Sequence, residues 1–303
     1  MVTLQHITKT YNKGKTVAVN DVSFSVGKGE IFGLIGPDGA GKTSIFRILT
    51  TLLLPDTGSA TVAGFDVVKQ YHEIRGVVGY MPGRFSLYQD LSVEENLNFF
   101  ATLFNTTIKE NYDLIKDIYV QIEPFKTRRA GKLSGGMKQK LALCCALIHK
   151  PLVLFLDEPT TGVDAVSRKE FWEMLKRLKE QDIAILVSTP YMDEAALCDR
   201  IALIQSGSIL SSDTPEGIRR SYPGKLFAVR SDTMYALLND VRNNEHVHNC
   251  FVFGEFLHLS FNNDSEEYGP VLVEYLKSKG HTNIELKSVQ PGIEDCFIDF
   301  LKH

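Results

Sequence analysis

Eight residues in the first part of the chain, "GPDGAGKT" from Gly36 to Thr43, combine three glycines with a lysine and a threonine. The glycines permit the positive φ angles that let backbone N–H groups converge on phosphate oxygens. Lys42 can reach β- and γ-phosphates, and the Thr43 hydroxyl suits Mg²⁺. An apolar strand pattern precedes the loop and a helical pattern follows it. The spacing therefore predicts a strand–loop–helix nucleotide site made by Gly36, Pro37, Asp38, Gly39, Ala40, Gly41, Lys42, Thr43 and Ser44.

The stretch "LVLFLDEP" from Leu152 places two acids after an apolar run. In open α/β folds the carboxyl ends of parallel strands form the edge where ligands bind, so Asp157 and Glu158 are predicted at that edge. Asp157 is suited to hold Mg²⁺ through water, and Glu158 to orient or deprotonate an attacking water. Two acids after an apolar strand are also a common solvent-exposed strand end. The phosphate loop is what favours the catalytic interpretation.

A third stretch, "KLSGGMKQK" from Lys132 to Lys140, narrows the class of phosphate-loop protein. Ser134 is a natural N-cap, and Gly135 and Gly136 would leave the first N–H groups of the following helix uncovered. Taken alone, these residues could be a simple capping motif. Together with the two sites above, "LSGGMKQK" resembles the signature of the ATP-binding cassette (ABC) family, and it precedes the acidic strand as it does in that family.

The resemblance runs from about Val2 to Pro215 and implies a mechanism in which two cassettes meet head to tail. ATP and Mg²⁺ are held by the phosphate loop and acids of one cassette and capped by the signature of the other. Tyr11 fits the family's adenine-stacking aromatic residue. Asp164 in "TTGVDAVSR" fits the acid of the D-loop, although it could also be only the N-cap of the next helix. The residues implied to act on the partner's ATP are Ser134, Gly135, Gly136 and Gln139.

Two positions near the γ-phosphate depart from the family pattern. Pro190 in "AILVSTPYMDEA" stands where the family usually has a histidine, and it offers neither a side-chain donor nor an N–H. The local pattern predicts Thr189 as a cap and Pro190 as the first residue of a helix. Gly83 stands where the family has the glutamine of its Q-loop, and Gln89 is six residues further on. Asp38, in place of the asparagine of many relatives, is a smaller change.

Each of these lost contacts is typically worth on the order of 10²-fold in rate at a preorganised site. We therefore expect a site that binds ATP and hydrolyses it slowly, while the intact signature completes a better site on another cassette. A heterodimer of cassettes is favoured over a homodimer for this reason. The alternative is a non-hydrolysing regulatory nucleotide-binding partner of a second cassette.

The expected fold class is α/β, a P-loop NTPase with a RecA-like core and a helical ABC insertion, plus a small α+β ferredoxin-like C-terminal domain. The cassette is predicted over residues 1–220, with its helical subdomain at about 83–150, and an accessory domain over 221–303. The turn-forming "SYPGK" from Ser221 marks the boundary. Beyond it, strand and helix patterns follow in β-α-β-β-α-β order.

The segment "QPGIEDCFIDFL" resembles the final helix of cassette subunits in drug- and polysaccharide-type exporters. The resemblance implies an ATP-hydrolysing subunit that energises a membrane exporter. Such a subunit is peripheral at the cytoplasmic face of the cell membrane, attached through membrane-spanning permease subunits. Cassette proteins that act on ribosomes or DNA instead carry two cassettes joined by a charged linker, or long coiled coils between their motifs. This chain has neither feature.

The composition of the 303 residues is that of a globular protein, and a formal net charge of −4 disfavours nucleic acid as a partner. The basic run from Lys126 to Lys132 is predicted to be a solvent-exposed loop. The N-terminus lacks the apolar segment of a secretory signal, and the apolar runs are shorter than the roughly 20 residues that cross a bilayer. Five cysteines are expected to be buried reduced thiols, and three histidines to be strand residues and not ligands: Cys144, Cys145, Cys198, Cys250, Cys296, His246, His248 and His258.

Overall fold

The computed structural model describes residues 1–262 and 268–302. By its internal contacts the chain divides into two compact units, Met1–Ile218 and Arg219–His303. In the described part of the chain, no helix combines the length and the apolar character that crossing a bilayer requires.

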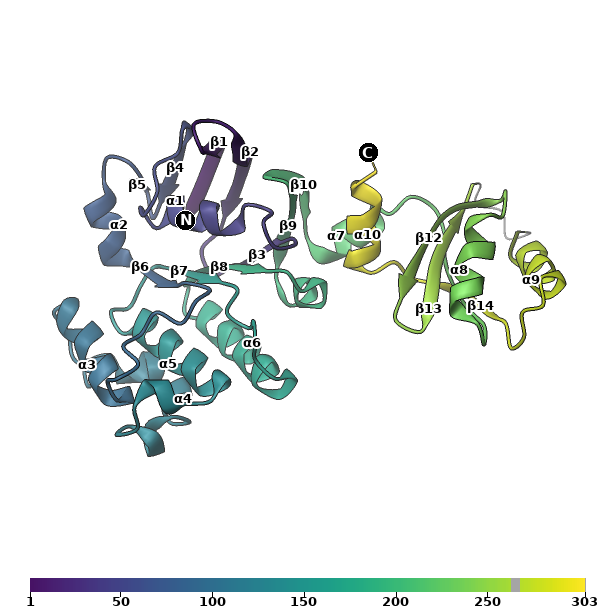
Figure 1. Cartoon of the computed structure of the whole chain (residues 1–303). Coiled ribbons are helices and arrows are strands. Elements are labelled where there is room, and N and C mark those ends of the chain that lie inside the picture. Colours follow the sequence, from purple (N-terminus) through teal and green to yellow (C-terminus); the bar gives the residue numbers. More distant parts are fainter. Residues whose placement is uncertain (263–267, 303) are drawn as a thin grey trace. The chain divides into compact units, whose positions relative to one another are not determined.

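A six-stranded sheet forms the centre of the first unit, in the order β10-β9-β3-β8-β7-β6 (Figure 1). Neighbouring strands from β9 to β6 are parallel, and only β10 pairs antiparallel. The strands that carry the two candidate motifs are fully buried, as apolar runs in a covered parallel sheet must be. The bounds are β3 Ile31–Ile35, β6 Val78–Met81, β7 Val153–Asp157, β8 Ala184–Thr189, β9 Arg200–Gln205 and β10 Ser208–Asp213.

One face of this sheet is covered by α1 and by an antiparallel sheet of order β2-β1-β4-β5 (Figure 1). Phe46 of α1 packs edge-on against Phe155 of β7, and Phe24 of β2 stacks on Phe32 of β3 at 5.0 Å between ring centroids. These contacts belong to one continuous apolar core. The bounds are β1 Val2–Tyr11, β2 Thr16–Val26, α1 Lys42–Leu49, β4 Thr57–Val62, β5 Phe65–Asp66 and α2 Tyr71–Val77.

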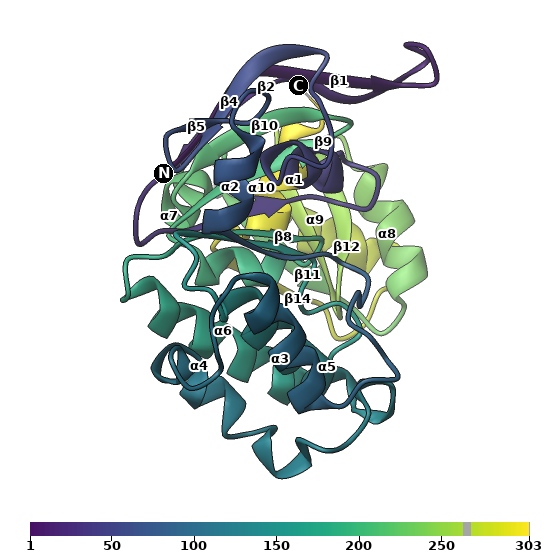
Figure 2. The same ribbon diagram turned by 90° about the vertical axis from the view of Figure 1, so that its left-hand side faces the viewer.

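The opposite face is covered by α5 and α6, and α3 and α4 pack beyond α5 (Figure 2). Local sequence explains where α3 begins: the Ser92 hydroxyl accepts from the N–H of Glu95, and the Glu95 carboxylate accepts from the N–H of Ser92. In the basic run from Lys126 to Lys132, residues 126–129 and Lys132 are exposed, as predicted, but Ala130 is buried and Ala130–Lys132 form a 3₁₀ turn. The bounds are α3 Val93–Leu103, α4 Tyr112–Tyr119, α5 Gly135–Leu147, α6 Ala165–Lys179 and α7 Pro215–Arg220, with 3₁₀ turns at Glu123–Phe125, Ala130–Lys132 and Met192–Leu197.

The second unit is an antiparallel sheet of order β12-β13-β11-β14. An apolar core joins α8 and α9 to one face through Leu237, Leu259 and Leu272. On α10, Asp295 bonds to His258 of β13 at 2.8 Å, so this histidine has a structural partner. The bounds are β11 Leu226–Arg230, α8 Met234–Arg242, β12 Val247–Phe253, β13 Phe256–Phe261, α9 Tyr268–Ser278, β14 Glu285–Val289 and α10 Ile293–Phe300.

None of the five cysteines forms a disulfide, and all five are buried. Burial raises the pKa of Cys250 to about 11 and that of Cys296 to about 12, and it raises the pKa values of Cys144, Cys145 and Cys198 further. Because the thiolate is the reactive form, all five should be slow to react at neutral pH.

We expect Ellman's reagent to titrate the five thiols only after denaturation. Ser23→Cys, at an exposed position of β2, supplies a control thiol that should react at once in the folded chain. Rapid release of several equivalents from the native protein would contradict the burial of these side chains.

Candidate nucleotide-binding site

The phosphate loop joins β3 to α1. Gly41, the N-cap of α1, has a φ of 102°, and a Cβ at this position would overlap the carbonyl oxygen of Ala18. Only glycine fits there. The first turn of α1 carries no acidic residue, and Gly41 supplies no side-chain cap. The N–H groups at this helix end are therefore oriented for an anion.

Lys42 connects the loop to the acidic strand. Its side chain is only 3% exposed, and its ammonium donates to the carbonyls of Gly36 at 2.7 Å and Pro37 at 2.9 Å. The same ammonium lies 3.2 Å from Glu158 Oε1. A buried lysine must be paired, so these partners hold the cation at the carboxyl edge of the sheet.

The acids at the end of β7 are fixed by β8. Asp157 is 3% exposed and pairs in register with Ser188, whose hydroxyl donates to Asp157 Oδ1 at 2.6 Å. Glu158 adopts a φ of 51°, and its N–H donates to Ser188 Oγ at 3.0 Å. Sequence reasoning missed Ser188. The only signal was a polar residue two positions before Pro190 in an apolar strand.

Three of the remaining loop residues have the exposure that ligand contact requires, whereas Ala40 is buried. Asp38, Gly39 and Thr43 are exposed. Ser44 is half-buried, and its hydroxyl bonds to the Tyr11 hydroxyl at 3.1 Å. The end of β1 therefore lies beside the first turn of α1, which sets the predicted aromatic residue next to the phosphate loop.

Position 83 lies against the acids. A Cβ on Gly83 would come within 3.1 Å of the Asp157 carbonyl oxygen and 3.8 Å of Glu158 Cβ. Gly83 therefore lies inside the site. Gln89 is exposed and lies beside Gly131 instead, to which its carbonyl is hydrogen-bonded.

The prediction that a helix begins at Pro190 is wrong. The turn after β8 is a 3₁₀ helix that starts at Met192, with Tyr191 as its N-cap. Thr189 caps locally by accepting from the N–H of Tyr191 at 3.0 Å. Glu194, in the first turn after β8, is 1% exposed and accepts a hydrogen bond from Thr160 at 2.7 Å. A tertiary partner outweighs the helix-start signal at this turn.

The signature begins α5. Ser134 is its N-cap and accepts from the N–H of Met137 at 3.3 Å. Gly135 is exposed, whereas Gly136 is buried against α6. A Cβ at Gly136 would lie 2.6 Å from Ser167 Oγ on α6. Gln139, one turn on, is half-buried. Gly136 is therefore needed for the packing of α5 on α6, a role that local sequence did not indicate.

Asp164 is the N-cap of α6. Its carboxylate accepts from the N–H groups of Ser167 at 3.0 Å and Val166 at 3.1 Å. These hydrogen bonds, that of Ser167 foremost, hold the pKa of Asp164 below its ordinary value. The capping role that the sequence left open is therefore present in the structure.

The donor set suits Mg²⁺ and a triphosphate. A hydroxyl at Thr43 and a carboxylate at Asp157 are the hard oxygen ligands that Mg²⁺ prefers. Lys42 and the N-terminus of α1 supply positive charge for phosphate oxygens.

Comparison with known proteins agrees with this site. The ABC transporter family model matches residues 19–161. The Nod factor export ATP-binding protein I of Rhizobium sp. (strain N33) is 33% identical over 94% of this chain and 92% of its own length. The chain belongs to the ATP-binding proteins of the ABC transporter family. The resemblance carried by the phosphate loop and signature is thereby confirmed.

Two further ABC relatives extend the comparison. The probable multidrug ABC transporter ATP-binding protein YbhF of Escherichia coli (strain K12) is 38% identical over 99% of this chain, which spans about half, 52%, of that relative. The ABC transporter ATP-binding protein NatA of Bacillus subtilis (strain 168) is 38% identical over 73% of this chain and 92% of its own length.

Solved ABC structures share the fold. The ATP-binding subunit of an ABC transporter superposes with a TM-score of 0.66 at 26% identity, over 73% of this chain and 92% of that one. The dimeric ATP-binding cassette MJ0796 bound to ADP and Pi superposes with a TM-score of 0.64 at 24% identity, over 71% of this chain and 98% of that one. The expected P-loop α/β fold of the ABC ATPases is therefore confirmed.

Lys42→Met should weaken ATP binding by about 10- to 100-fold, because hydrogen bonds to charged groups are worth about 1.5–3 kcal/mol. Fluorescence titration with a labelled ATP analogue measures the change. Lys179→Met is the matched control. Lys179 is the last residue of α6, and its ammonium also pairs with a carboxylate, that of Asp199 at 2.6 Å. Equal affinities of the two variants would contradict the assignment of Lys42.

Proposed function

We propose that the chain is the ATP-binding and slowly hydrolysing subunit of a membrane ABC transporter that works as an exporter. The observation that carries the proposal is the buried Lys42 ammonium, held between the phosphate loop and Glu158 at 3.2 Å. Phosphate binding and water activation are thereby joined at one sheet edge. The relatives named for multidrug transport and Nod factor export support the exporter class.

In this proposal each residue has a separate task. Lys42 and the N–H groups of α1 bind the phosphates, and Tyr11 lies beside the base. Thr43 and Asp157 hold Mg²⁺, which neutralises phosphate charge when bound. Glu158 orients the attacking water once its carboxylate is no longer paired with Lys42.

Slow turnover follows from two missing donors. Gly83 adjoins the acids but has no side chain to contact water or metal, and Pro190 follows β8 without a donor. Each missing contact lowers the rate by on the order of 10²-fold. The second candidate function, a regulatory cassette without turnover, is favoured by the same two residues and by the engagement of Glu158 with Lys42.

The signature is proposed to complete a nucleotide site on a second, different cassette, through Ser134, Gly135, Gly136 and Gln139. Asp164 would face that partner from the D-loop. The exposure of Ser134 and Gly135 supports this arrangement. A heterodimer explains how an intact signature coexists with a nucleotide site that lacks two donors.

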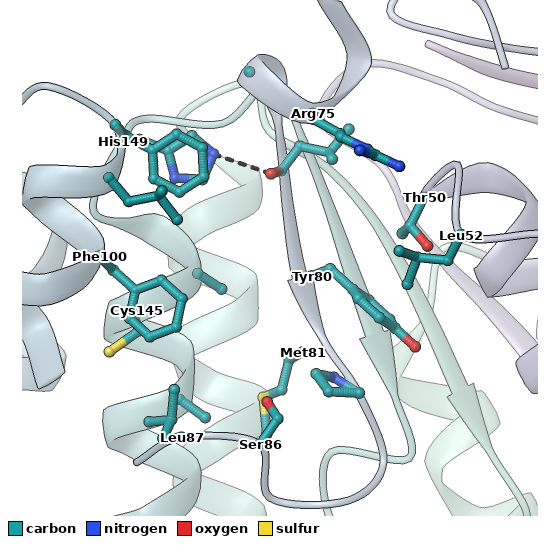
Figure 3. A pocket seen from close by; sticks show the side chains of 17 residues that line it. Thr50, Leu52, Arg75, Tyr80, Met81, Ser86, Leu87, Phe100, Cys145 and His149 are labelled. Atoms are coloured by element: carbon teal, nitrogen blue, oxygen red, sulfur yellow. Dashed lines mark hydrogen bonds between the residues drawn. The ribbon is translucent and has the colours of Figure 1, made fainter. Parts of the chain in front are cut away.

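An apolar groove of about 680 Å³ in the first unit is proposed to receive a short helix of a membrane-spanning permease subunit. Figure 3 shows Phe100, Cys145 and Leu87 on one side of the groove and Tyr80 and Leu52 on the other. Because Met81, beside the groove, precedes Gly83 by two residues, a helix seated there would lie next to the acids. That continuity supports a permease as the occupant.

Two titratable groups of the groove, on His149 and Tyr80, are neutral at neutral pH, whereas Arg75 adds a positive charge to the lining. His149 stacks on Phe104 with ring centroids 3.8 Å apart and bonds to the Val78 carbonyl at 3.0 Å (Figure 3). Its burial lowers its pKa, only partly offset by that bond. Burial, with the charge of Asp157, raises the pKa of Tyr80 to about 12. A largely apolar helix surface is therefore the chemistry that fits.

The domain boundaries proposed are 1–220 for the cassette and 221–303 for an accessory domain of ferredoxin-like class. The order β12-β13-β11-β14, with helices between the first two and the last two strands along the chain, supports that class. The subunit is proposed to be peripheral at the cytoplasmic face of the membrane, with no nucleic-acid partner.

Restoring the lost donor at position 190 should accelerate hydrolysis. We expect the purified chain to turn over slowly and Pro190→His to raise its rate, by up to about 10²-fold, since a side-chain donor returns at the end of β8. Gly83→Gln should help less, because its Cβ meets the Asp157 carbonyl oxygen at 3.1 Å.

Phosphate release by each variant, alone and co-purified with a second cassette, measures the effect. Glu158→Gln in the Pro190→His background is the control and should abolish the gain. A wild-type rate equal to that of an ordinary cassette, abolished by Glu158→Gln, would overturn the slow-site proposal. No gain in any variant or pair would favour the regulatory function.

A charge at the groove should detach the permease. Leu103→Asp alters an exposed groove residue, and Leu152→Asp alters an equally apolar exposed residue away from it. When the chain is co-expressed with membrane-spanning permease subunits, we expect Leu103→Asp to lose stoichiometric co-elution while ATP binding persists. Unchanged co-elution of Leu103→Asp would refute the groove as the docking site.

A further inference from the structure

The strand β8 lies between the phosphate-loop strand β3 and the acidic strand β7. Ser188 sits in register with Leu34 of β3 and with Asp157 of β7, and it is fully buried. No other polar side chain of β8 reaches the acids in the described contacts, since Thr189 caps Tyr191 instead. Ser188 is therefore the side chain through which the central strand acts on the site.

The hydrogen bonds of Ser188 have only one consistent direction. The N–H of Glu158 must donate, so Ser188 Oγ accepts at 3.0 Å. The single hydroxyl proton is then free to be donated to Asp157 Oδ1 at 2.6 Å. One buried hydroxyl thus bridges the proposed Mg²⁺ carboxylate and the backbone of the proposed catalytic glutamate.

This bridge fixes two conformations that the acids would not keep unaided. The hydrogen bond from Ser188 to Oδ1 restrains the rotation of the Asp157 carboxylate. The backbone of Glu158 is in the left-handed region at a φ of 51°, which non-glycine residues rarely adopt. Its N–H reaches both the Ser188 carbonyl at 3.1 Å and the hydroxyl at 3.0 Å, and this pair of acceptors holds the turn.

We propose that Ser188 is a positioning residue that sets Asp157 for Mg²⁺ and Glu158 for the attacking water. The inference rests on the proposed ATP-binding function and deepens it. It also explains how Pro190 can follow β8. Proline at position 190 offers no contact to the phosphate, but Ser188, two residues earlier, still positions the acids.

The test compares ATP binding with and without Mg²⁺. Ser188→Ala removes the hydroxyl without adding volume, and Ser188→Thr retains it. Ser23→Ala is the matched control, because Ser23 also accepts a backbone N–H, that of His6 at 2.8 Å, in the separate antiparallel sheet. A fluorescent ATP analogue gives the affinity in EDTA and the half-saturating Mg²⁺ concentration.

We expect Ser188→Ala to raise the half-saturating Mg²⁺ concentration by about 10- to 100-fold, as removal of a partner of a metal ligand typically does. Affinity in EDTA should stay at the wild-type value, because the phosphate loop is untouched. Ser188→Thr and Ser23→Ala should behave as the wild type. In the Asp157→Asn background, Ser188→Ala should add no further loss, since both act on one ligand.

The remaining outcomes separate the two proposals. If the wild type binds no ATP analogue under either condition, the proposed function fails, and the role of Ser188 fails with it. If the wild type binds with Mg²⁺ enhancement and Ser188→Ala does the same, only the role of Ser188 is refuted. An equal loss in EDTA and in Mg²⁺ would show that the hydroxyl merely supports the fold, and it too would refute the inference.

Discussion

The site depends on one buried cation. The Lys42 ammonium is held by two loop carbonyls, those of Gly36 and Pro37, and by the Glu158 carboxylate. A lysine at 3% exposure without partners would be costly or would lose its proton. The phosphate loop and the acidic strand must therefore stay within one side chain's reach. That requirement explains why both strands are short, apolar and buried, and why they lie in one parallel sheet with only β8 between them.

The middle strand supplies the alignment. Thr189 of β8 accepts the N–H of Gly36 at 3.2 Å, and Ser188 accepts the N–H of Glu158. The start of the phosphate loop and the end of the acidic strand are thus both tied to consecutive residues of β8. Pro190, which follows directly, cannot disturb these bonds, because proline lacks only its own N–H and the ladder ends at Thr189. The hydrogen bonds by which β8 aligns the site are therefore all made before Pro190.

What the sequence could predict was local. Glycine spacing indicated the phosphate loop, apolar runs indicated β3 and β7, and Ser134 was identified as a helix cap before its contact with Met137 was known. What it missed joins residues about 30 positions apart: Ser188 to Asp157, and Thr160 to Glu194. A serine in an apolar strand, or a glutamate in a first turn, has the same local pattern whether or not a distant partner exists. The 3₁₀ turn at Met192 differs from the predicted helix for that reason, since its geometry follows the buried Glu194.

The signature permits a sharper distinction between structure and function. Gly136 is explained by packing alone, because Ser167 leaves no room for a Cβ, and Ser134 is explained by its role as the N-cap of α5.

Gly135 has neither explanation. It is exposed, its nearest neighbour would sit at an ordinary 3.4 Å from a Cβ, and its φ is not positive. In a helix interior, glycine lowers helix stability by up to about 1 kcal/mol relative to alanine. No contact in the first turn of α5 requires glycine at position 135. Gly135 is exposed at the N-terminus of α5, and the fold does not require glycine there. The absence of a side chain would let a ligand from outside the chain come close to the backbone. The exposure of Gly135 therefore supports the proposal that the signature contacts a partner's ligand.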